Sequence, residues 1–210
     1  MRIGIIGSGK VGGALGTRWG QSGHEVVFGS RDPEAPHMKE LAAKAGGNAS
    51  TATLAETAKT GEILLLATPQ QSNQQVLMDL GDLTGKILID ATNPFLPQLA
   101  GLKVGTTTSG GEQVASWAQG AKVVKAFNTV GFNIMSNPDF GGERPVMFYC
   151  GDDTGAKASV KKLVEDVGFE AVDAGPLQQA RVLEPFSFLW VTLASFYGLG
   201  REFAFKLIRR

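Results

Sequence analysis

Three glycines near the start of the chain have the spacing of a phosphate-binding turn. Gly7, Gly9 and Gly12 form a G-x-G-x-x-G pattern directly after the apolar run at residues 3–6. In a strand, turn and helix unit, the first glycine permits the sharp turn, the second lets the backbone approach a pyrophosphate, and the third allows close packing of the helix. The free N–H groups of the helix start would then bind the pyrophosphate.

A second phosphate-binding motif overlaps these glycines. Gly4 with Gly9 and Lys10 matches most of a P-loop, but that motif needs Ser or Thr next, and Val11 follows. The P-loop would also turn the apolar residues at 5 and 6 into loop. The dinucleotide pattern is therefore preferred.

The end of the second expected strand, at residues 24–28, indicates which dinucleotide is bound. NAD-binding proteins usually place an acidic residue there for the ribose 2′-hydroxyl. This chain has Ser30 and Arg31 instead, with Asp32 displaced into the following turn. Arg31 can form charge-assisted bonds to a 2′-phosphate, and Ser30 can add a neutral donor. The pair favours NADP over NAD; the alternative is that Arg31 is an ordinary solvated loop charge.

Small and amide residues follow four of the expected strands. Ligands of open parallel sheets bind outside the carboxyl ends of the strands, so a flat ring could cross a low rim there. For any single residue a plain turn explains the choice equally well. The four ends are Gly7 to Gly12, Ala67-Thr68-Pro69, Thr92-Asn93-Pro94 and Asn128-Thr129.

Few side chains could serve as an acid or a base at these ends. His24 begins a strand and indicates a packing role, whereas His37 follows Arg31 and could touch the adenosine part. Asp90 could orient a ribose or an acceptor, or cap the turn after its strand. Cys150 lies in an apolar strand and is expected to be inert. A 2-hydroxyacid or imine reductase would need a Lys or His acid, for which Lys125 is a weak candidate.

The order of the expected elements predicts an α/β fold, a Rossmann-type doubly wound, mostly parallel sheet with a C-terminal helical segment. Residues 1–175 would form the NADP-binding domain, and residues 176–210 a helical segment that packs on it or on a partner subunit. The expected strands are 3–6, 24–28, 48–52, 62–67, 86–90, 123–127, 145–151 and 169–173; the expected helices are 13–20, 38–45, 54–59, 70–80, 109–117, 156–166 and most of 178–210.

Composition excludes several partners. Twenty basic and twenty acidic residues balance, which gives no reason to expect nucleic acid or an anionic membrane as a partner. The single cysteine excludes an internal disulfide. The chain opens in a core strand without a signal peptide, and its most apolar run, 186–197, is too short to span a bilayer; a cytoplasmic protein is expected.

Four segments together resemble a known family. They are Ile5 to Gly12, Gly29 to Pro33, Asp90 to Pro94 and Val124 to Thr129. This set is similar to the NADPH:deazaflavin (coenzyme factor 420) oxidoreductases and to the cytosolic reductase domain of the STEAP metalloreductases, over about residues 1–175.

The resemblance implies an NADP-dependent oxidoreductase that transfers hydride between NADP(H) and a flavin or deazaflavin. It implies cofactor binding by Gly7, Ser8, Gly9, Lys10, Val11, Gly12, Ser30 and Arg31, with Ala67, Thr68 and Pro69 beside the nicotinamide. It also places Ala126, Asn128 and Thr129 near the acceptor ring. Asn93, which follows a neighbouring strand, belongs to the same rim and is a further candidate for the acceptor side.

The apolar C-terminal helix bears on both the acceptor and the oligomeric state. Its aromatic residues, Trp190 among them, could wall a flavin-like ring and could also pack in a homodimer. Hydride transfer between stacked rings requires positioning rather than an acid or base. The competing hypothesis is a non-catalytic NADP(H)-binding sensor or regulatory module, which would share the glycine pattern but lack an acceptor site.

Overall fold

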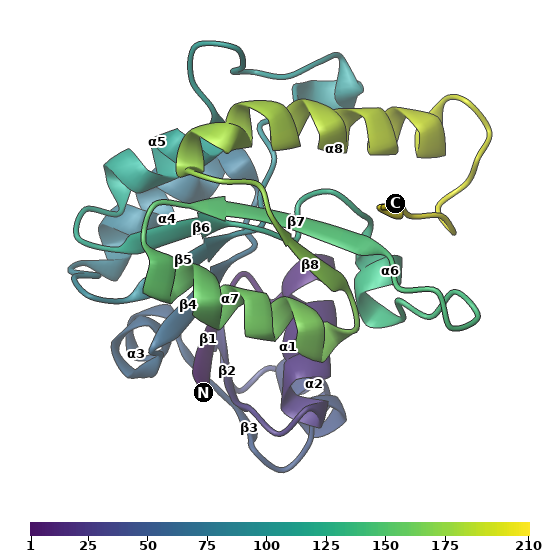
Figure 1. Ribbon diagram of the computed structural model, residues 1–210. Coiled ribbons are helices and arrows are strands. Elements are labelled where there is room, and N and C mark those ends of the chain that lie inside the picture. The colour runs from purple at the N-terminus through teal and green to yellow at the C-terminus, as the bar shows by residue number, and fades with distance from the viewer.

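One eight-stranded sheet lies between two layers of helices in the computed structural model, which describes all 210 residues (Figure 1). The strands are β1 Arg2–Ile6, β2 Glu25–Ser30, β3 Ala49–Thr53, β4 Ile63–Leu66, β5 Ile87–Asp90, β6 Lys122–Lys125, β7 Val146–Gly151 and β8 Glu170–Asp173. Their order is β3-β2-β1-β4-β5-β6-β7-β8, and every neighbouring pair is parallel except β6 with β7. The predicted doubly wound, mostly parallel sheet is confirmed.

The helices divide between the two faces of the sheet. They are α1 Lys10–Gln21, α2 Pro36–Ala45, α3 Leu54–Thr60, α4 Asn73–Leu80, α5 Gly110–Trp117, α6 Phe132–Ser136, α7 Thr154–Val167 and α8 Ala180–Ser195, with short 3-10 turns at Gln70–Ser72, Pro97–Leu99 and Leu177–Gln179. α1, α2, α6 and α7 pack together on one face, and α3, α4, α5 and α8 on the other. Each layer buries its own apolar core against the sheet.

The central strands are buried on both faces, as their unbroken apolar sequences predict. All four residues of β4 are buried, and so are the last four of β1. Ile5 of β1 pairs in register with Phe28 of β2 and Leu65 of β4. Each such side chain contributes about 1.5 to 3 kcal/mol when fully buried. This parallel register brings the carboxyl ends of β2, β1 and β4 to one edge of the sheet.

Several element boundaries differ from the sequence prediction; α1, for example, begins at Lys10 rather than residue 13. α2 begins at Pro36 rather than residue 38, because proline is favourable in the first turn of a helix. The helix expected over residues 70–80 begins as a 3-10 turn before α4. β6 ends at Lys125, two residues early, since Phe127 has a φ of 60° and leaves the strand conformation.

Ser109 and Glu112, at the start of α5, have the spacing of a capping box, which forms only in part. The Ser109 side chain accepts the backbone N–H of Glu112. The Glu112 carboxylate accepts from the Ser109 hydroxyl and from the Arg181 guanidinium, and not from the backbone N–H of Ser109 as a complete capping box requires. Arg181 approaches with two nitrogens, at 2.8 and 2.6 Å, and lowers the pKa of Glu112. The ion pair therefore joins α5 to α8. A complete capping box starts α3 instead, with Thr53 and Glu56.

The C-terminal helical segment is shorter than predicted. α8 ends at Ser195, and residues 196–210 contain no helix. Gly198 and Gly200 have positive φ values of 74° and 68°, which turn the chain back (Figure 1). Phe203 then stacks on Trp190, with ring centroids 5.2 Å apart. Phe203 and Phe205 of the tail are half-buried against aromatic side chains of α8, and the Phe205 carbonyl accepts the backbone N–H of Val146 in β7.

Candidate functional site

The glycine turn between β1 and α1 has the geometry that its spacing predicts. Gly7 has a φ of +109°, a conformation that favours glycine. A Cβ on Gly12 would lie 2.1 Å from the Gly7 carbonyl oxygen, so only glycine allows α1 to start this close to β1. A Cβ on Gly9 would meet no protein atom within 4 Å. The open side of Gly9 is where a ligand can approach the backbone.

The start of α1 remains free for an anion. Gly9 is the N-cap residue, and no side chain caps the helix, so its first N–H groups have no side-chain partner. The Ser8 hydroxyl donates to the Gly29 carbonyl at 2.9 Å and fixes the turn against the end of β2. This arrangement fits a pyrophosphate bound by backbone N–H groups at a helix N-terminus.

The end of β2 leaves one cation available. The Ser30 hydroxyl accepts the backbone N–H of Asp32 at 3.1 Å and donates to the Asp32 carbonyl at 3.0 Å, which closes the turn. Ser30 is therefore engaged within the turn rather than aimed at a ligand. Arg31 is exposed and makes no ion pair. Arg31 is the residue at this strand end that is free to bond a phosphate.

A hollow of about 560 Å³ joins Gly7 and Ser8 of the glycine turn to the end of β2 and to the residues that follow β4, at the carboxyl ends of β1, β2 and β4. The strand order switches between β1 and β4: β2 and β3 are added on one side of β1, and β4 and the later strands on the other side. Open α/β sheets bind ligands at such a switch point. His37, which was expected to reach the adenosine part of the dinucleotide, lines this hollow. The lining residues are Gly7, Ser8, Gly29, Ser30, Arg31, His37, Met38, Leu54, Thr68, Pro69, Ser72, Val76 and Asp79.

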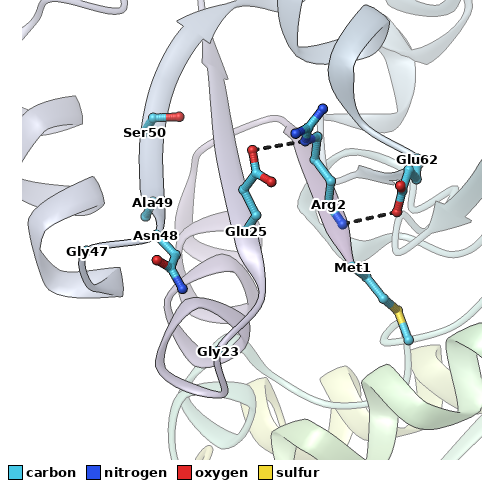
Figure 2. Close-up of a pocket in the computed structure, with 9 residues that line it drawn as sticks. All are labelled: Met1, Arg2, Gly23, Glu25, Gly47, Asn48, Ala49, Ser50 and Glu62. Atoms are coloured by element: carbon cyan, nitrogen blue, oxygen red, sulfur yellow. Dashed lines mark hydrogen bonds and ion pairs between the residues drawn. The ribbon is translucent and has the colours of Figure 1, made fainter.

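A larger hollow, of about 780 Å³, lies at the opposite edge of the sheet (Figure 2). Its walls are the amino ends of the strands, where Arg2 is already paired with Glu25 at 2.9 Å and its backbone N–H with Glu62 at 3.3 Å. These charges satisfy one another. The geometry of a parallel sheet therefore assigns the ligand to the smaller hollow.

Hydrogen bonds join the ends of β4, β5 and β6 into one rim. Asn73, at the start of α4, accepts from the Thr68 hydroxyl (2.8 Å) and donates to Thr92 Oγ1 (2.9 Å). Asn93 Nδ2 donates to the Asn128 carbonyl (2.9 Å), and Asn128 Nδ2 returns a bond to Asn93 Oδ1 (3.2 Å). Sequence analysis missed Asn73, although an Asn at a helix start was the available signal.

Most residues expected near the acceptor ring lie beneath the rim surface. Ala126, Asn128, Thr129 and Trp190 are between 0% and 3% exposed, and only Asn93 is half-buried. The Thr129 hydroxyl points to the Met147 sulfur at 3.6 Å. These side chains shape and support the rim, and the atoms that a ring could touch belong to Asn93 and to the backbone.

A buried charge cluster supports the rim from below. Lys125 Nζ lies 2.8 Å from Asp90 Oδ2 and 2.8 Å from Glu184 Oε1, and donates to the Thr92 carbonyl at 2.7 Å. Lys125 and Asp90 are 0% exposed, and Glu184 is 1% exposed. Burial lowers the pKa of Lys125, but the two carboxylates outweigh this effect and raise it. Lys125 is therefore a fixed cation and not the acid that an imine reductase would need.

The Asp90 and Glu184 carboxylates are fully committed. Asp90 Oδ1 accepts the backbone N–H and the hydroxyl of Thr92, so the turn-capping alternative for Asp90 is the observed one. Glu184 accepts the N–H groups of Gly110 and Gly111, each at 2.9 Å, at the start of α5. Glu184 is the only acidic residue of the largely apolar helix α8, and this lone acid was the sequence signal for the cluster.

α8 is joined directly to the rim. The Ser187 hydroxyl donates to the Asn128 carbonyl, and Asn128 Nδ2 donates to the Leu183 carbonyl at 3.2 Å. Further along α8, Trp190 Nε1 donates to the Phe203 carbonyl at 3.0 Å. The predicted closeness of the C-terminal helix to the strand ends is therefore observed, but Trp190 faces the tail.

The remaining candidates have structural roles. His24 is 6% exposed and lies 2.8 Å from Asp166, as the packing hypothesis expects. Burial raises the pKa of Cys150 to about 12, so its thiol is inert near neutral pH. None of the helices combines the length and apolar character needed to cross a bilayer.

The strand order, the glycine turn and the hollow at the reversal point define a dinucleotide-binding protein of the Rossmann class. Residues 2–94 match the family model described as NADP oxidoreductase, coenzyme F420-dependent. The chain is 32% identical over 210 residues to the F420-dependent NADP reductase of Methanothermobacter marburgensis, covering 92% of each chain. This chain belongs to that family and is an NADP-dependent oxidoreductase, which confirms the resemblance found in the sequence.

Two further relatives extend the comparison. A solved structure from Arthrobacter sp. FB24, described as a candidate F420-dependent NADP reductase, superposes with a TM-score of 0.87 over 99% of both chains, at 31% identity. Metalloreductase STEAP3 of Rattus norvegicus is 31% identical over 183 residues, and the match covers 87% of this chain but 36% of that protein. The chain thus spans about a third of the metalloreductase.

Proposed function

We propose that this chain transfers hydride between NADP(H) and a flavin or deazaflavin-type acceptor. The supporting observation is that the glycine turn and the hydrogen-bonded rim lie side by side at one edge of the sheet. A dinucleotide on the turn would extend its nicotinamide toward the rim. The family description names coenzyme F420, a deazaflavin, as the partner of NADP.

The cofactor side consists of the turn, the end of β2 and the end of β4. The uncapped start of α1 and the open side of Gly9 fit a pyrophosphate, and unpaired Arg31 fits a 2′-phosphate. Ala67, Thr68 and Pro69 flank the nicotinamide. The full proposed set is Gly7, Ser8, Gly9, Lys10, Val11, Gly12, Ser30, Arg31, Ala67, Thr68 and Pro69.

The acceptor side is the rim of Asn93 and Asn128, supported by Ala126, Thr129 and Trp190. The reciprocal bonds between Asn93 and Asn128 fix the ends of β5 and β6 relative to each other, which gives a ring a flat surface to lie on. Because α8 is hydrogen-bonded to Asn128, the helix also fixes the position of this surface. These residues position the acceptor and do not react with it.

NADPH supplies the hydride when it is bound, and the reduced ring takes its accompanying proton from solvent, so the hydride transfer itself needs no acid or base from the protein. The side chains agree, because Lys125 and Asp90 are locked in the buried cluster and His24 is paired with Asp166. The contribution of this chain is to bring two rings together and to exclude water between them.

Anaerobic NADPH oxidation screened against a deazaflavin, FMN, FAD and ferric chelates tests this proposal. We expect oxidation with a flavin or deazaflavin and slower oxidation with NADH. Oxidation with ferric chelates alone would contradict the acceptor class, and NADPH binding without turnover on any acceptor would support the sensor hypothesis instead.

We also propose a homodimer through the outer face of the C-terminal segment, residues 176–210, with residues 1–175 as the NADP-binding unit. Large apolar side chains are exposed there, and soluble proteins seldom leave such a patch uncovered. They are Val182, Leu189, Phe196, Tyr197 and Leu199, between 47% and 71% exposed. Sedimentation velocity should report a dimer. A monomer at micromolar concentration would contradict this proposal.

A further inference from the structure

A third hollow, of about 330 Å³, lies beside the glycine turn between α1, α2 and α6. We refer to it as the basic hollow, because its lining includes three cations, Lys10, Arg18 and Lys44, and no Asp or Glu. Neutral donors complete the wall. The lining residues are Gly9, Lys10, Gly13, Ala14, Thr17, Arg18, Gln21, Leu41, Lys44, Phe132 and Ser136.

The cations of the basic hollow have no counter-charge on the protein. Lys10, Arg18 and Lys44 make no ion pair, although Lys39 on the same helix as Lys44 is paired with Glu34 at 2.8 Å. Three like charges around one concave surface repel one another and raise the local positive potential. A bound anion would offset this repulsion.

Two of these cations are held in place. Arg18 Nη2 donates to the Val167 carbonyl at 2.9 Å, and its Nε is buried without a partner. Lys10 Nζ lies 5.2 Å from the centroid of the Phe132 ring. Arg201 from the C-terminal tail lies 5.5 Å from the same ring and adds a fourth positive charge nearby. Prior fixation of a guanidinium reduces the entropy lost when it binds an anion.

The basic hollow lies between the dinucleotide side and the acceptor side of the site, and Arg18, Lys44 and Phe132 extend it beyond the residues proposed for the dinucleotide. It shares no lining residue with the hollow that contains Arg31. Gly9 and Lys10 connect it to the glycine turn, and Phe132 connects it to the loop that follows Asn128 of the rim. A group that enters it can therefore belong to a molecule whose ring lies on the rim.

We propose that the basic hollow is an anion-binding subsite for phosphate or carboxylate groups on the side chain of the electron acceptor. This inference rests on the proposed function, since it requires an acceptor on the rim. The same chemistry would also attract free inorganic phosphate, so the experiment must separate the two sources.

The first test does not involve an acceptor. Inorganic pyrophosphate is titrated calorimetrically into the NADP⁺-saturated protein, in which the glycine turn is already occupied. Arg18→Gln/Lys44→Gln should weaken binding about tenfold, the scale of one or two charge-assisted bonds. The matched control, Lys59→Gln/Arg210→Gln, removes one Lys and one Arg that are exposed and outside the hollow. No binding to wild type, or equal binding to the double variant, overturns the subsite.

The second test separates the acceptor from free phosphate. FMN and riboflavin share a ring but only FMN carries a phosphate, so wild type should have the lower KM for FMN. In Arg18→Gln/Lys44→Gln the KM for FMN should rise about tenfold, with the KM for riboflavin and the Kd for NADPH unchanged. Equal KM values in wild type overturn the assignment to the acceptor side chain. If neither flavin nor a deazaflavin oxidises NADPH, both the proposed function and the assignment of the hollow to the acceptor side chain are wrong. The pyrophosphate titration decides independently whether the hollow binds anions.

Discussion

The dinucleotide side and the acceptor side of the site are built in different ways. The dinucleotide side depends on a short local unit, β1, the glycine turn and α1, in which backbone geometry provides the binding groups. The acceptor side is assembled from β5, β6, α4 and α8, which are far apart in the sequence and are joined by buried polar bonds. Damage to the first should affect binding alone, whereas damage to the second should affect folding and turnover.

The largest expected effect is on the buried cluster. Lys125→Met leaves the Asp90 and Glu184 carboxylates buried without their cation, and should lower the free energy of unfolding by about 3 to 5 kcal/mol. Urea denaturation measures this change. The control is Lys122→Met on the same strand, whose ion pair with Asp153 is exposed, and which should change stability little. Equal effects of the two substitutions would show that the cluster does not hold the acceptor side together.

The next effect is on the glycine turn. Gly9→Val meets no protein atom, so the chain should fold normally, but the side chain blocks the pyrophosphate and should weaken NADPH binding at least 100-fold. Gly47→Val, which also points into open space but at the other edge of the sheet, is the control. Calorimetry and melting temperature together check this. Normal NADPH binding by a folded Gly9→Val protein would exclude the turn as the pyrophosphate site.

Arg31 should have a smaller and more selective effect. Arg31→Ala removes the unpaired cation at the end of β2 and should weaken NADPH binding by roughly 2 kcal/mol, about 30-fold, with little change for NADH. Lys59→Ala removes another exposed, unpaired cation and should change neither. An equal loss for both cofactors on titration of Arg31→Ala would mean that Arg31 does not bind the 2′-phosphate.

The smallest expected effect is on the rim. Asn93→Ala removes both bonds with Asn128 and should lower acceptor turnover about fivefold, the scale of 1 kcal/mol, while the Kd for NADPH is retained. Asn48→Ala, at the amino edge of the sheet, is the control (Figure 2). If turnover is unchanged and NADPH binding falls, Asn93 belongs to the dinucleotide side instead.

The same contrast explains what the sequence could predict. The glycine turn, the parallel strands and Arg31 are encoded by neighbouring residues, so spacing and apolar runs were sufficient to find them. Asn73 and Glu184 could not be assigned, because their partners, Thr92 and Lys125, lie on other elements and meet only in the folded sheet. The non-helical tail also depends on tertiary contacts, since Phe203 is fixed by stacking on Trp190.

Isotope transfer tests hydride transfer most directly. NADPH labelled with deuterium on the transferring face of C4 is oxidised anaerobically with a deazaflavin, whose acceptor carbon does not exchange with water, and the product is examined by mass spectrometry. The glycine turn beside the rim predicts that the reduced deazaflavin carries the deuterium on its acceptor carbon, and that unlabelled NADPH in deuterated water places none on that carbon. Reduced acceptor whose new hydrogen comes from water, or no reduction by NADPH of any deazaflavin or flavin, would contradict direct transfer between two rings held at this edge of the sheet.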